Sequence, residues 1–151
     1  MKFRQAVMTD IEQLFALEQK VVEAERPYNA DIKKDKPIYY DMKHLITKDD
    51  SYLIVAEDKG EIVGTGYSQI QVSKQSLEHK KHAYLGFMYV SPQYRGKGLN
   101  KTIMQKLVSW GKSQGVNNHY LEVYSGNTSA IRAYEKTGFK PCLIGMKLNT
   151  E

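Results

Sequence analysis

The segment that decides the fold is Ser91–Gly98, which reads SPQYRGKG and places two glycines and two cations in one short loop. An apolar run, YLGFMYV, precedes this loop, and an amphipathic run, LNKTIMQKLVSWGKSQG, follows it. Glycine lets backbone N–H groups approach an anion closely, and the start of the following helix adds the positive end of its dipole. The loop therefore predicts a phosphate-binding site where a strand passes into a helix.

Two common nucleotide-binding loops nearly match this segment but fail at required glycines. A Walker A loop has the pattern G-x-x-x-x-G-K-[ST], and Arg95 and Asn100 stand where its two glycines belong. A dinucleotide-binding loop has the pattern G-x-G-x-x-G, and Lys101 takes the place of its third glycine. That loop also opens the first βαβ unit of a parallel sheet, whereas a predicted antiparallel meander precedes this one. The sequence thus supports neither nucleotide-binding fold.

Hydrophobic periodicity predicts the remaining elements. Strands are predicted at residues 1–7, 51–58, 61–73, 82–90, 119–124 and 141–148, and helices at residues 9–25, 38–47, 99–114 and 128–137. The turn at Lys59 and Gly60 joins two of these strands in a hairpin, and Arg26–Pro37, with two prolines and no clear period, is predicted as a loop. The order β-α-α-β-β-β-α-β-α-β predicts an α/β (α+β) fold, with a mixed, mostly antiparallel twisted sheet flanked by helices.

The composition is that of one globular domain spanning residues 1–151, with 41% hydrophobic and 26% charged residues. No apolar run approaches the roughly 18 residues of a membrane span, and the first ten residues lack the apolar core of a secretory signal, so we expect a cytoplasmic protein. Cys142 is the single cysteine, which we expect to be a buried packing residue, and no Cys/His cluster has metal-ligand spacing. The net charge of +5 is interleaved with acids, which argues against a nucleic-acid partner.

Two segments together resemble the GNAT superfamily of N-acetyltransferases. The acetyl-CoA loop of that superfamily has the pattern [RQ]-x-x-G-x-[GA], which Gln93–Gly98 matches. A second segment, LEVYSGNTSAIRAYEKTGF, lies about thirty residues further on and matches the superfamily at spacing. Its matching residues are Asn127, Ala130, Tyr134, Gly138 and Phe139. The resemblance covers nearly the whole chain and implies the GNAT fold.

The resemblance implies acetyl-CoA as co-substrate and no metal. Backbone N–H groups of the loop would hold the pyrophosphate, as the residue types also suggest, because they form a concave nest of donors at a helix start. The strand before the loop would bind the pantetheine arm and polarise the thioester carbonyl. The residues implied for binding acetyl-CoA are Met88, Tyr89, Val90, Arg95, Gly96, Lys97, Gly98, Leu99, Asn100, Lys101, Asn127, Ala130 and Tyr134. Asn100 departs from the glycine or alanine that many members carry.

The implied reaction is a direct attack by a primary amine on the acetyl group, with Tyr134 as the acid that protonates the leaving thiolate. Many members place a glutamate on the strand before the loop, but no acid lies between Lys80 and Val90. Strict alternation would set His82, Tyr84 and Gly86 on one face of this strand and Ala83, Leu85 and Phe87 on the other. The candidate bases are therefore Glu122, His82, Glu23, Glu25 and Asp31.

The acceptor amine cannot be read from the sequence. The segment Val21–Pro37 is expected to border its site and carries both acids and lysines, so a small-molecule amine and a peptide amine both fit. The absent strand acid motivates an alternative function, a non-catalytic acyl-CoA-binding or regulatory module. No membrane partner is expected. Exposed strand edges in this fold often pair, so a homodimer is one oligomeric state to consider.

Overall fold

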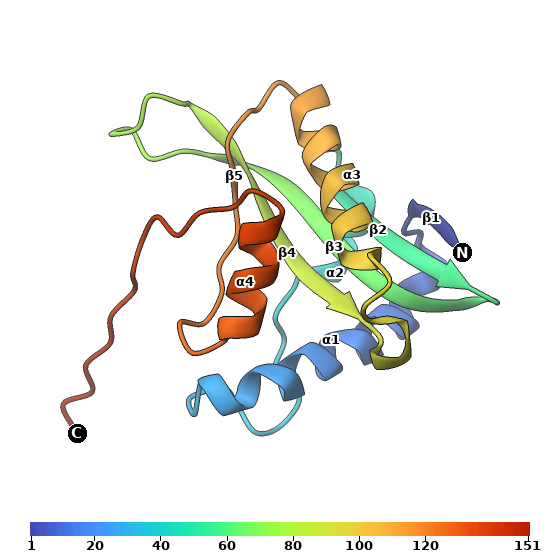
Figure 1. Ribbon diagram of the computed structural model, residues 1–151, viewed down its shortest axis with the longest axis horizontal. Coiled ribbons are helices and arrows are strands. Elements are labelled where there is room, and N and C mark those ends of the chain that lie inside the picture. The colour runs from blue at the N-terminus through green and yellow to red at the C-terminus, as the bar shows by residue number, and fades with distance from the viewer.

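The computed structural model describes residues 1–151, which form one five-stranded sheet with helices on both faces (Figure 1). The strands are β1 (Lys2–Gln5), β2 (Ser51–Asp58), β3 (Glu61–Val72), β4 (Lys81–Val90) and β5 (His119–Tyr120). The helices are α1 (Ile11–Glu25), α2 (Met42–Thr47), α3 (Leu99–Ser113) and α4 (Thr128–Lys136), with short 3-10 turns at Met8–Asp10, Arg26–Tyr28 and Pro92–Tyr94. The strands follow chain order across the sheet, and β4–β5 is the one parallel pair. No helix has the length and apolar character required to cross a membrane.

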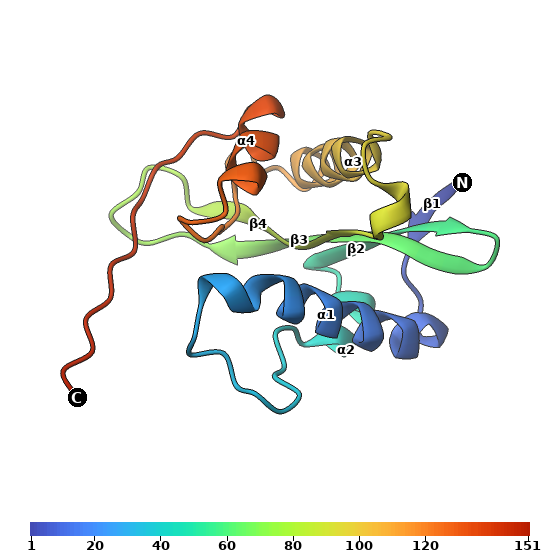
Figure 2. The same cartoon turned by 60° about the horizontal axis from the view of Figure 1, so that its bottom comes forward.

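The sheet separates two layers of helices, with α1 and α2 on one face and α3 and α4 on the other (Figure 2). The alternation of β2 supplies both cores, because successive side chains of a strand point to opposite faces. Leu53 and Val55 pack in the core beneath α1 and α2, whereas Ile54 and Ala56 pack in the core beneath α3. All four side chains are at most 1% exposed. The sheet is therefore fixed between two apolar layers, which hold its strands in register.

A β-bulge interrupts β4 in the middle of the sheet. Leu85 packs in the α3 core, whereas Phe87, two residues later, packs in the α1 core. Phe87 has a φ of 54°, in the left-handed region that a bulky side chain seldom adopts, and the pairing with β3 shifts register between Thr65 and Tyr67. The strict alternation expected along this strand is therefore wrong beyond Leu85, because the bulge moves the later side chains to the opposite faces.

The predicted element order is confirmed as far as α4, but the last predicted strand is wrong. Residues 141–148 form no strand, and Leu143, Ile144, Met146 and Leu148 are each more than 80% exposed. The strand predicted at residues 119–124 is also shorter, since only His119 and Tyr120 pair with β4. A two-residue edge offers too few ladder hydrogen bonds to hold a further strand, and Pro141 has no N–H to donate. The expectation that Cys142 is buried is likewise wrong, because this segment leaves it exposed.

Candidate functional site

The candidate site begins where β4 and β5 part. The two strands pair at Ala83 with His119 and at Tyr84 with Tyr120. Beyond Tyr84, one edge of β4 stays paired with β3, whereas the edge that faced β5 pairs with no strand. Figure 1 shows the chain after β5 turning away from β4 toward α4. The bulge at Phe87 lies along this unpaired edge. The divergence leaves an opening in the sheet at the level of Gly86–Val90.

The end of this opening carries a backbone donor. The Ser91 N–H donates to the Val63 carbonyl on β3 at 2.8 Å. Because neighbouring N–H groups of a strand point to opposite edges, the Val90 N–H points into the opening. The Arg95 guanidinium marks the same edge, since its Nε donates to the Val90 carbonyl at 2.9 Å and its Cζ lies 5.9 Å from the centre of the Tyr89 ring. The structure thus places the last residue of β4 and the first cation of the loop side by side.

The loop between β4 and α3 presents a series of unused N–H groups. Gly96 and Gly98 have φ values of 76° and 81°, which glycine adopts without steric cost, and Gly98 is the N-cap of α3. None of the N–H groups of Gly96–Lys101 donates a hydrogen bond to another group of the protein. The N–H groups of the first helical turn have no carbonyl one turn earlier to accept them. The Thr102 N–H is the first that bonds, to the Gly98 carbonyl at 3.1 Å. Six consecutive N–H groups at the start of α3 therefore have no acceptor within the protein, as in an anion-binding nest.

Several of the residues predicted to bind acetyl-CoA make contacts within the protein. The Arg95 N–H donates to the Pro92 carbonyl at 3.2 Å, so the series of unused N–H groups begins at Gly96. The Asn100 amide donates to the Met104 sulfur at 3.6 Å, back along α3. The Lys97 ammonium lies 5.4 Å from the centre of the Tyr94 ring, whereas the Lys101 side chain is exposed to solvent. Leu99 is 8% exposed and anchors the helix start in the α3 core.

On the other side of the opening, α4 presents the residues of the second motif. The Asn127 Oδ1 caps the helix by accepting the Ala130 N–H at 3.3 Å, which leaves its amide NH₂ available as a donor. Tyr134 packs edge-on against Phe139, with ring centres 6.3 Å apart. Burial raises the pKa of the Tyr134 hydroxyl, and the negative charge of Glu25 raises it further. The hydroxyl is therefore held protonated within range of a carboxylate from another helix.

That carboxylate, Glu25, is the last residue of α1 and is half-buried. Burial raises its pKa above that of an ordinary glutamate, and a contact with the Tyr39 side chain opposes part of this shift. The buried Tyr39 hydroxyl lies near this carboxylate, but outside good hydrogen-bond geometry. Glu25 was one of several acids that the sequence could not rank, because its position at the end of α1 gives no hint of burial against the tyrosines of residues 39–40.

Glu122 lies in the chain that follows β5 and accepts a hydrogen bond from the Tyr84 hydroxyl of β4 at 3.0 Å. This contact spans the start of the opening, just beyond the last paired residues. Burial raises the pKa of Tyr84, and the charges of Glu122 and Glu25 raise it further. Both carboxylates therefore act on the same hydroxyl. Of the candidate residues, Glu122 is hydrogen-bonded to β4 through Tyr84, and the charge of Glu25 acts on both Tyr84 and Tyr134.

His82 lies elsewhere, near the start of β4, where it pairs with Gln71 of β3 and directly precedes the pairing with β5 at Ala83. Its Nδ1 is 2.8 Å from the Ser73 hydroxyl, which is also 2.7 Å from the Nδ1 of His79. The His79 Nε2 lies 2.9 Å from the Tyr120 hydroxyl, and burial lowers the pKa of His82. These contacts tie the β3–β4 hairpin to β5. The imidazole thus belongs to a hydrogen-bonded chain at the closed end of the strand pair rather than to the opening.

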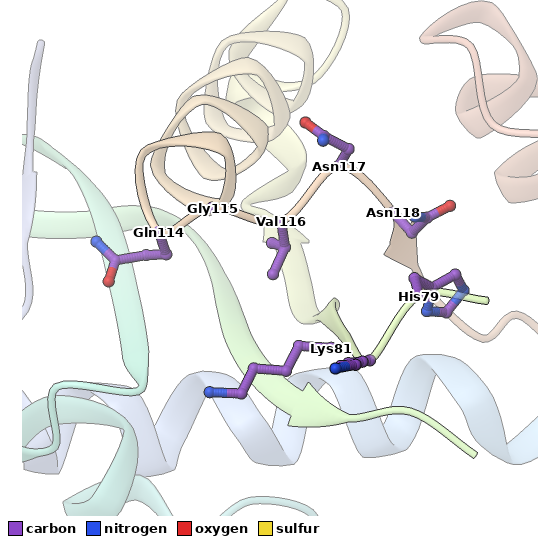
Figure 3. Close-up of a pocket in the computed structure, with 8 residues that line it drawn as sticks. His79, Lys81, Gln114, Gly115, Val116, Asn117 and Asn118 are labelled. Atoms are coloured by element: carbon purple, nitrogen blue, oxygen red, sulfur yellow. The ribbon is translucent and has the colours of Figure 1, made fainter. Parts of the chain in front are cut away.

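Two surface hollows flank these elements. One, of about 370 Å³, lies beside His79 and Lys81, against the chain that joins α3 to β5 at residues 114–118 (Figure 3). The other, of about 520 Å³, lies between α1 and the loop after β4 and is lined by Ala16, Gln19, Lys20, Glu23, Ala24, Tyr89, Pro92 and Arg95. The second hollow adjoins the Val90 end of the opening, whereas the first lies at its closed end. A molecule that enters the opening from the second hollow would therefore approach it on the α1 side of the sheet.

Known proteins resemble this chain in sequence and in fold. An N-alpha-acetyltransferase of Sulfurisphaera tokodaii is 27% identical over 144 residues, which cover 92% of this chain and 80% of that protein. A mutant of the BH1408 protein of Bacillus halodurans has the same fold with a TM-score of 0.89 at 23% identity, covering 100% of both chains. A predicted acetyltransferase of Clostridium acetobutylicum, solved with acetyl-CoA, aligns with a TM-score of 0.78 at 21% identity over 98% of this chain and 95% of that chain. The sequence profile of the Acetyltransferase (GNAT) family matches residues 12–139. The chain therefore belongs to the Acetyltransferase (GNAT) family.

Proposed function

We propose that the protein transfers the acetyl group of acetyl-CoA to a primary amine by direct attack, without an acyl-enzyme. The observation that carries this proposal is the opening between β4 and β5, which has an N–H donor at Val90 and the anion-binding nest at its end. A carboxylate, Glu25, approaches the opening from one face of the sheet and a protonated tyrosine, Tyr134, from the other. The proposed acid and base thus come from the two helix layers on either side of the parted strands, and acyl transfer uses both kinds of group.

The donor half of the site is the backbone of β4 and the loop. Acetyl-CoA supplies a pyrophosphate, an amide-containing arm and a reactive thioester. The six N–H groups from Gly96 to Lys101 fit the pyrophosphate, because hydrogen bonds to a charged group contribute roughly 1.5 to 3 kcal/mol each. The Val90 N–H is placed to stabilise the negative charge that develops on the acetyl oxygen. Asn127 offers its free amide NH₂ to the arm.

Glu25 is the group we assign as general base. An alkyl amine has a pKa of about 10.4, so at pH 7 only about one molecule in 2,500 is neutral, and a proton must leave before attack. Half-burial and a raised pKa suit Glu25 to accept that proton. Glu122 is more exposed and already accepts the Tyr84 hydroxyl, and His82 lies at the closed end of the strand pair. We therefore give Glu122 a binding role and leave His82 outside the reaction.

Tyr134 supplies the proton for the thiolate. The amine nitrogen forms a bond to the acetyl carbon, the carbon–sulfur bond breaks, and the sulfur takes the phenolic proton. The attacking nitrogen still carries one proton more than the amide needs, and this proton restores the tyrosine. The net change releases one proton, through Glu25, when the amine enters as an ammonium. The raised pKa of Tyr134 keeps its proton in place until the thiolate forms.

The comparisons support an amine as acceptor. The relative from Sulfurisphaera tokodaii is named for acetylation of an α-amine, and a solved aminoglycoside 6'-N-acetyltransferase of Acinetobacter haemolyticus shares the fold with a TM-score of 0.75 at 13% identity, covering 100% of this chain and 99% of that chain. The direct test is release of CoA thiol when the protein, acetyl-CoA and a panel of primary amines are mixed. Turnover that requires both acetyl-CoA and an amine supports the proposal. Binding of acetyl-CoA without turnover on any amine would instead favour a non-catalytic acyl-CoA-binding module.

A further inference from the structure

A glutamate within α1 is buried, although acids are almost never buried without a partner. Glu18 is 2% exposed and forms no ion pair, whereas the other buried acid, Asp10, is paired with Arg4. The Glu18 Oε2 instead accepts two backbone N–H groups, from Tyr39 at 3.1 Å and from Tyr40 at 2.9 Å. These two residues lie in a segment without helix or strand. The carboxylate therefore supplies the acceptor that a regular element would have provided.

The neighbouring side chain of α1 holds the same segment. The Gln19 Nε2 donates to the Pro37 carbonyl at 3.0 Å, and Pro37 is buried. Consecutive side chains of one helix thus hold both ends of residues 37–40, which we call the strap. Tyr39 and Tyr40 of the strap pack against the apolar core between the α1 layer and the sheet. The strap is therefore fixed to the α1 face of the sheet.

Tyr40 connects the strap to the bulge in β4. Its ring stacks on the Phe87 ring, with centres 4.7 Å apart and planes at 28°, and meets the Tyr67 ring edge-on at 5.8 Å. The Thr65 hydroxyl donates to the Phe87 carbonyl at 2.7 Å. A bulky residue with a φ of 54° is strained, and such a conformation persists only where its surroundings hold it. The stacked ring of Tyr40 is one of the contacts that hold Phe87 there.

The bulge decides which N–H groups of β4 face the opening. The Ala83 N–H donates to the Asn118 carbonyl, on the β5 side, at 2.9 Å. The Ser91 N–H donates to the Val63 carbonyl, on the β3 side, at 2.8 Å. In a regular strand these two N–H groups, eight positions apart, would point to the same edge, because successive N–H groups alternate. The extra residue at the bulge reverses this alternation, so the Val90 N–H points into the opening.

We propose that Glu18 is a positioning residue: by holding the strap it keeps Tyr40 stacked on Phe87 and so keeps the bulge in place. The inference rests on the proposed acetyltransferase function, in which the Val90 N–H stabilises the acetyl oxygen. The hydrogen bonds of the Glu18 carboxylate go to the strap alone, and the nest at Gly96–Lys101 lies on the other side of the bulge in sequence. Loss of the carboxylate should therefore slow the chemical step and leave the binding of acetyl-CoA nearly unchanged.

The kinetic test compares Glu18→Ala with Glu18→Gln, because a glutamine keeps an oxygen that can accept both N–H groups and an alanine does not. In Glu18→Ala we expect kcat for thiol release to fall at least about tenfold, with KM for acetyl-CoA changed less than about threefold. Glu18→Gln should keep kcat within about threefold of the wild-type value.

Two further variants separate positioning from a general loss of stability. Tyr40→Leu removes the ring that stacks on Phe87 and leaves the hydrogen bonds of Glu18 in place, so kcat should fall by a factor similar to that of Glu18→Ala. Val116→Ala is the control, because Val116 is 5% exposed and packs in the α3 core, away from the strap. This variant should be less stable than the wild type, with an unchanged kcat at temperatures where it is folded.

Backbone amide signals in proton–nitrogen correlation spectra give a readout that needs no turnover. Glu18→Ala and Tyr40→Leu should shift the signals of Phe87–Val90, and Val116→Ala should leave these signals in place. Unmoved signals in both Glu18→Ala and Tyr40→Leu, or a kcat within about threefold of wild type in both, would overturn the positioning role. A wild-type protein that turns over no amine would count against the acetyltransferase proposal instead, and the amide signals would still decide whether Glu18 holds the bulge.

Discussion

Tyr134 on α4 and Glu25 on α1 belong to helices on opposite faces of the central sheet, yet the charge of Glu25 adds to burial in raising the pKa of the Tyr134 hydroxyl. Such an interaction across a closed, hydrogen-bonded sheet would have to pass through backbone and packed side chains. Here the strands part after Tyr84 and Tyr120, so the sheet is not closed between the two helices. The proposed mechanism therefore depends on the divergence of β4 and β5, which opens the sheet between the layers that carry the proposed acid and the proposed base.

Replacement of the proposed acid tests its role. Tyr134→Phe keeps the ring that packs on Phe139 and removes the hydroxyl, so the fold should persist while the thiolate leaves without a proton. We expect kcat for thiol release to fall roughly a hundredfold, with KM for acetyl-CoA changed less than about threefold. Tyr120→Phe, at the closed end of the strand pair, is the matched control. Unchanged turnover in Tyr134→Phe would show that the thiolate needs no acid.

The pH profile tests the base. Glu25 must be ionised to accept a proton, and its pKa is raised by burial, so kcat/KM should fall as the pH is lowered through a value above the ordinary glutamate pKa of about 4.3. Glu25→Gln should remove this acidic limb and lower kcat by about a hundredfold. Persistence of the limb in Glu25→Gln, together with its loss in Glu122→Gln, would reassign the base to Glu122.

Gly86, next to the bulge in β4, lies too close to Tyr67 to carry a side chain. A Cβ at this position would lie 2.5 Å from the Tyr67 hydroxyl oxygen and 2.6 Å from two ring carbons. Gly86→Ala should therefore lower the free energy of unfolding by about 1 to 3 kcal/mol, measured by chemical denaturation. Gly145→Ala, where a Cβ meets no atom within 4 Å, is the control. A fully stable Gly86→Ala protein would mean that Tyr67 moves aside without cost.

A partly buried ion pair links β1 to the residue just before α1. Arg4 donates to the Asp10 carboxylate through both terminal nitrogens, at 2.8 and 2.9 Å, and Asp10 is 5% exposed. Asp10→Asn should cost about 3 kcal/mol at pH 7, whereas Asp49→Asn, at an exposed position, should cost little. The hydrogen bond from Arg4 lowers the pKa of Asp10, so its stabilisation is present above the unfolded-state pKa and is lost as the pH falls toward the lower folded-state value. Equal sensitivity of wild type and Asp10→Asn to acid would contradict this role.

The sequence predicted the loop and the helix order because these features are local. Glycines at positions 96 and 98, an amphipathic run after them and the Asn127 cap each act within a few residues. The bulge at Phe87 was not predictable, since it depends on how Gly86 meets a tyrosine from another strand. The same holds for Glu25, whose burial comes from tyrosines that the fold brings to it. The final apolar segment shows the converse, because its composition favours a strand but the two-residue edge of β5 provides no partner.

The central claim is that the nest at Gly96–Lys101 holds the pyrophosphate of acetyl-CoA, and calorimetric titration with acetyl-CoA tests it most directly. Gly96→Glu places a negative charge in the nest, while Gly60→Glu places the same side chain at a hairpin turn with a similar φ, 82° against 76°, and no atom within 4 Å of a Cβ at either site. We predict binding with a Kd on the order of micromolar for wild type and Gly60→Glu, and none for Gly96→Glu. Absence of binding to the wild-type protein, or equal binding to both variants, would contradict the account.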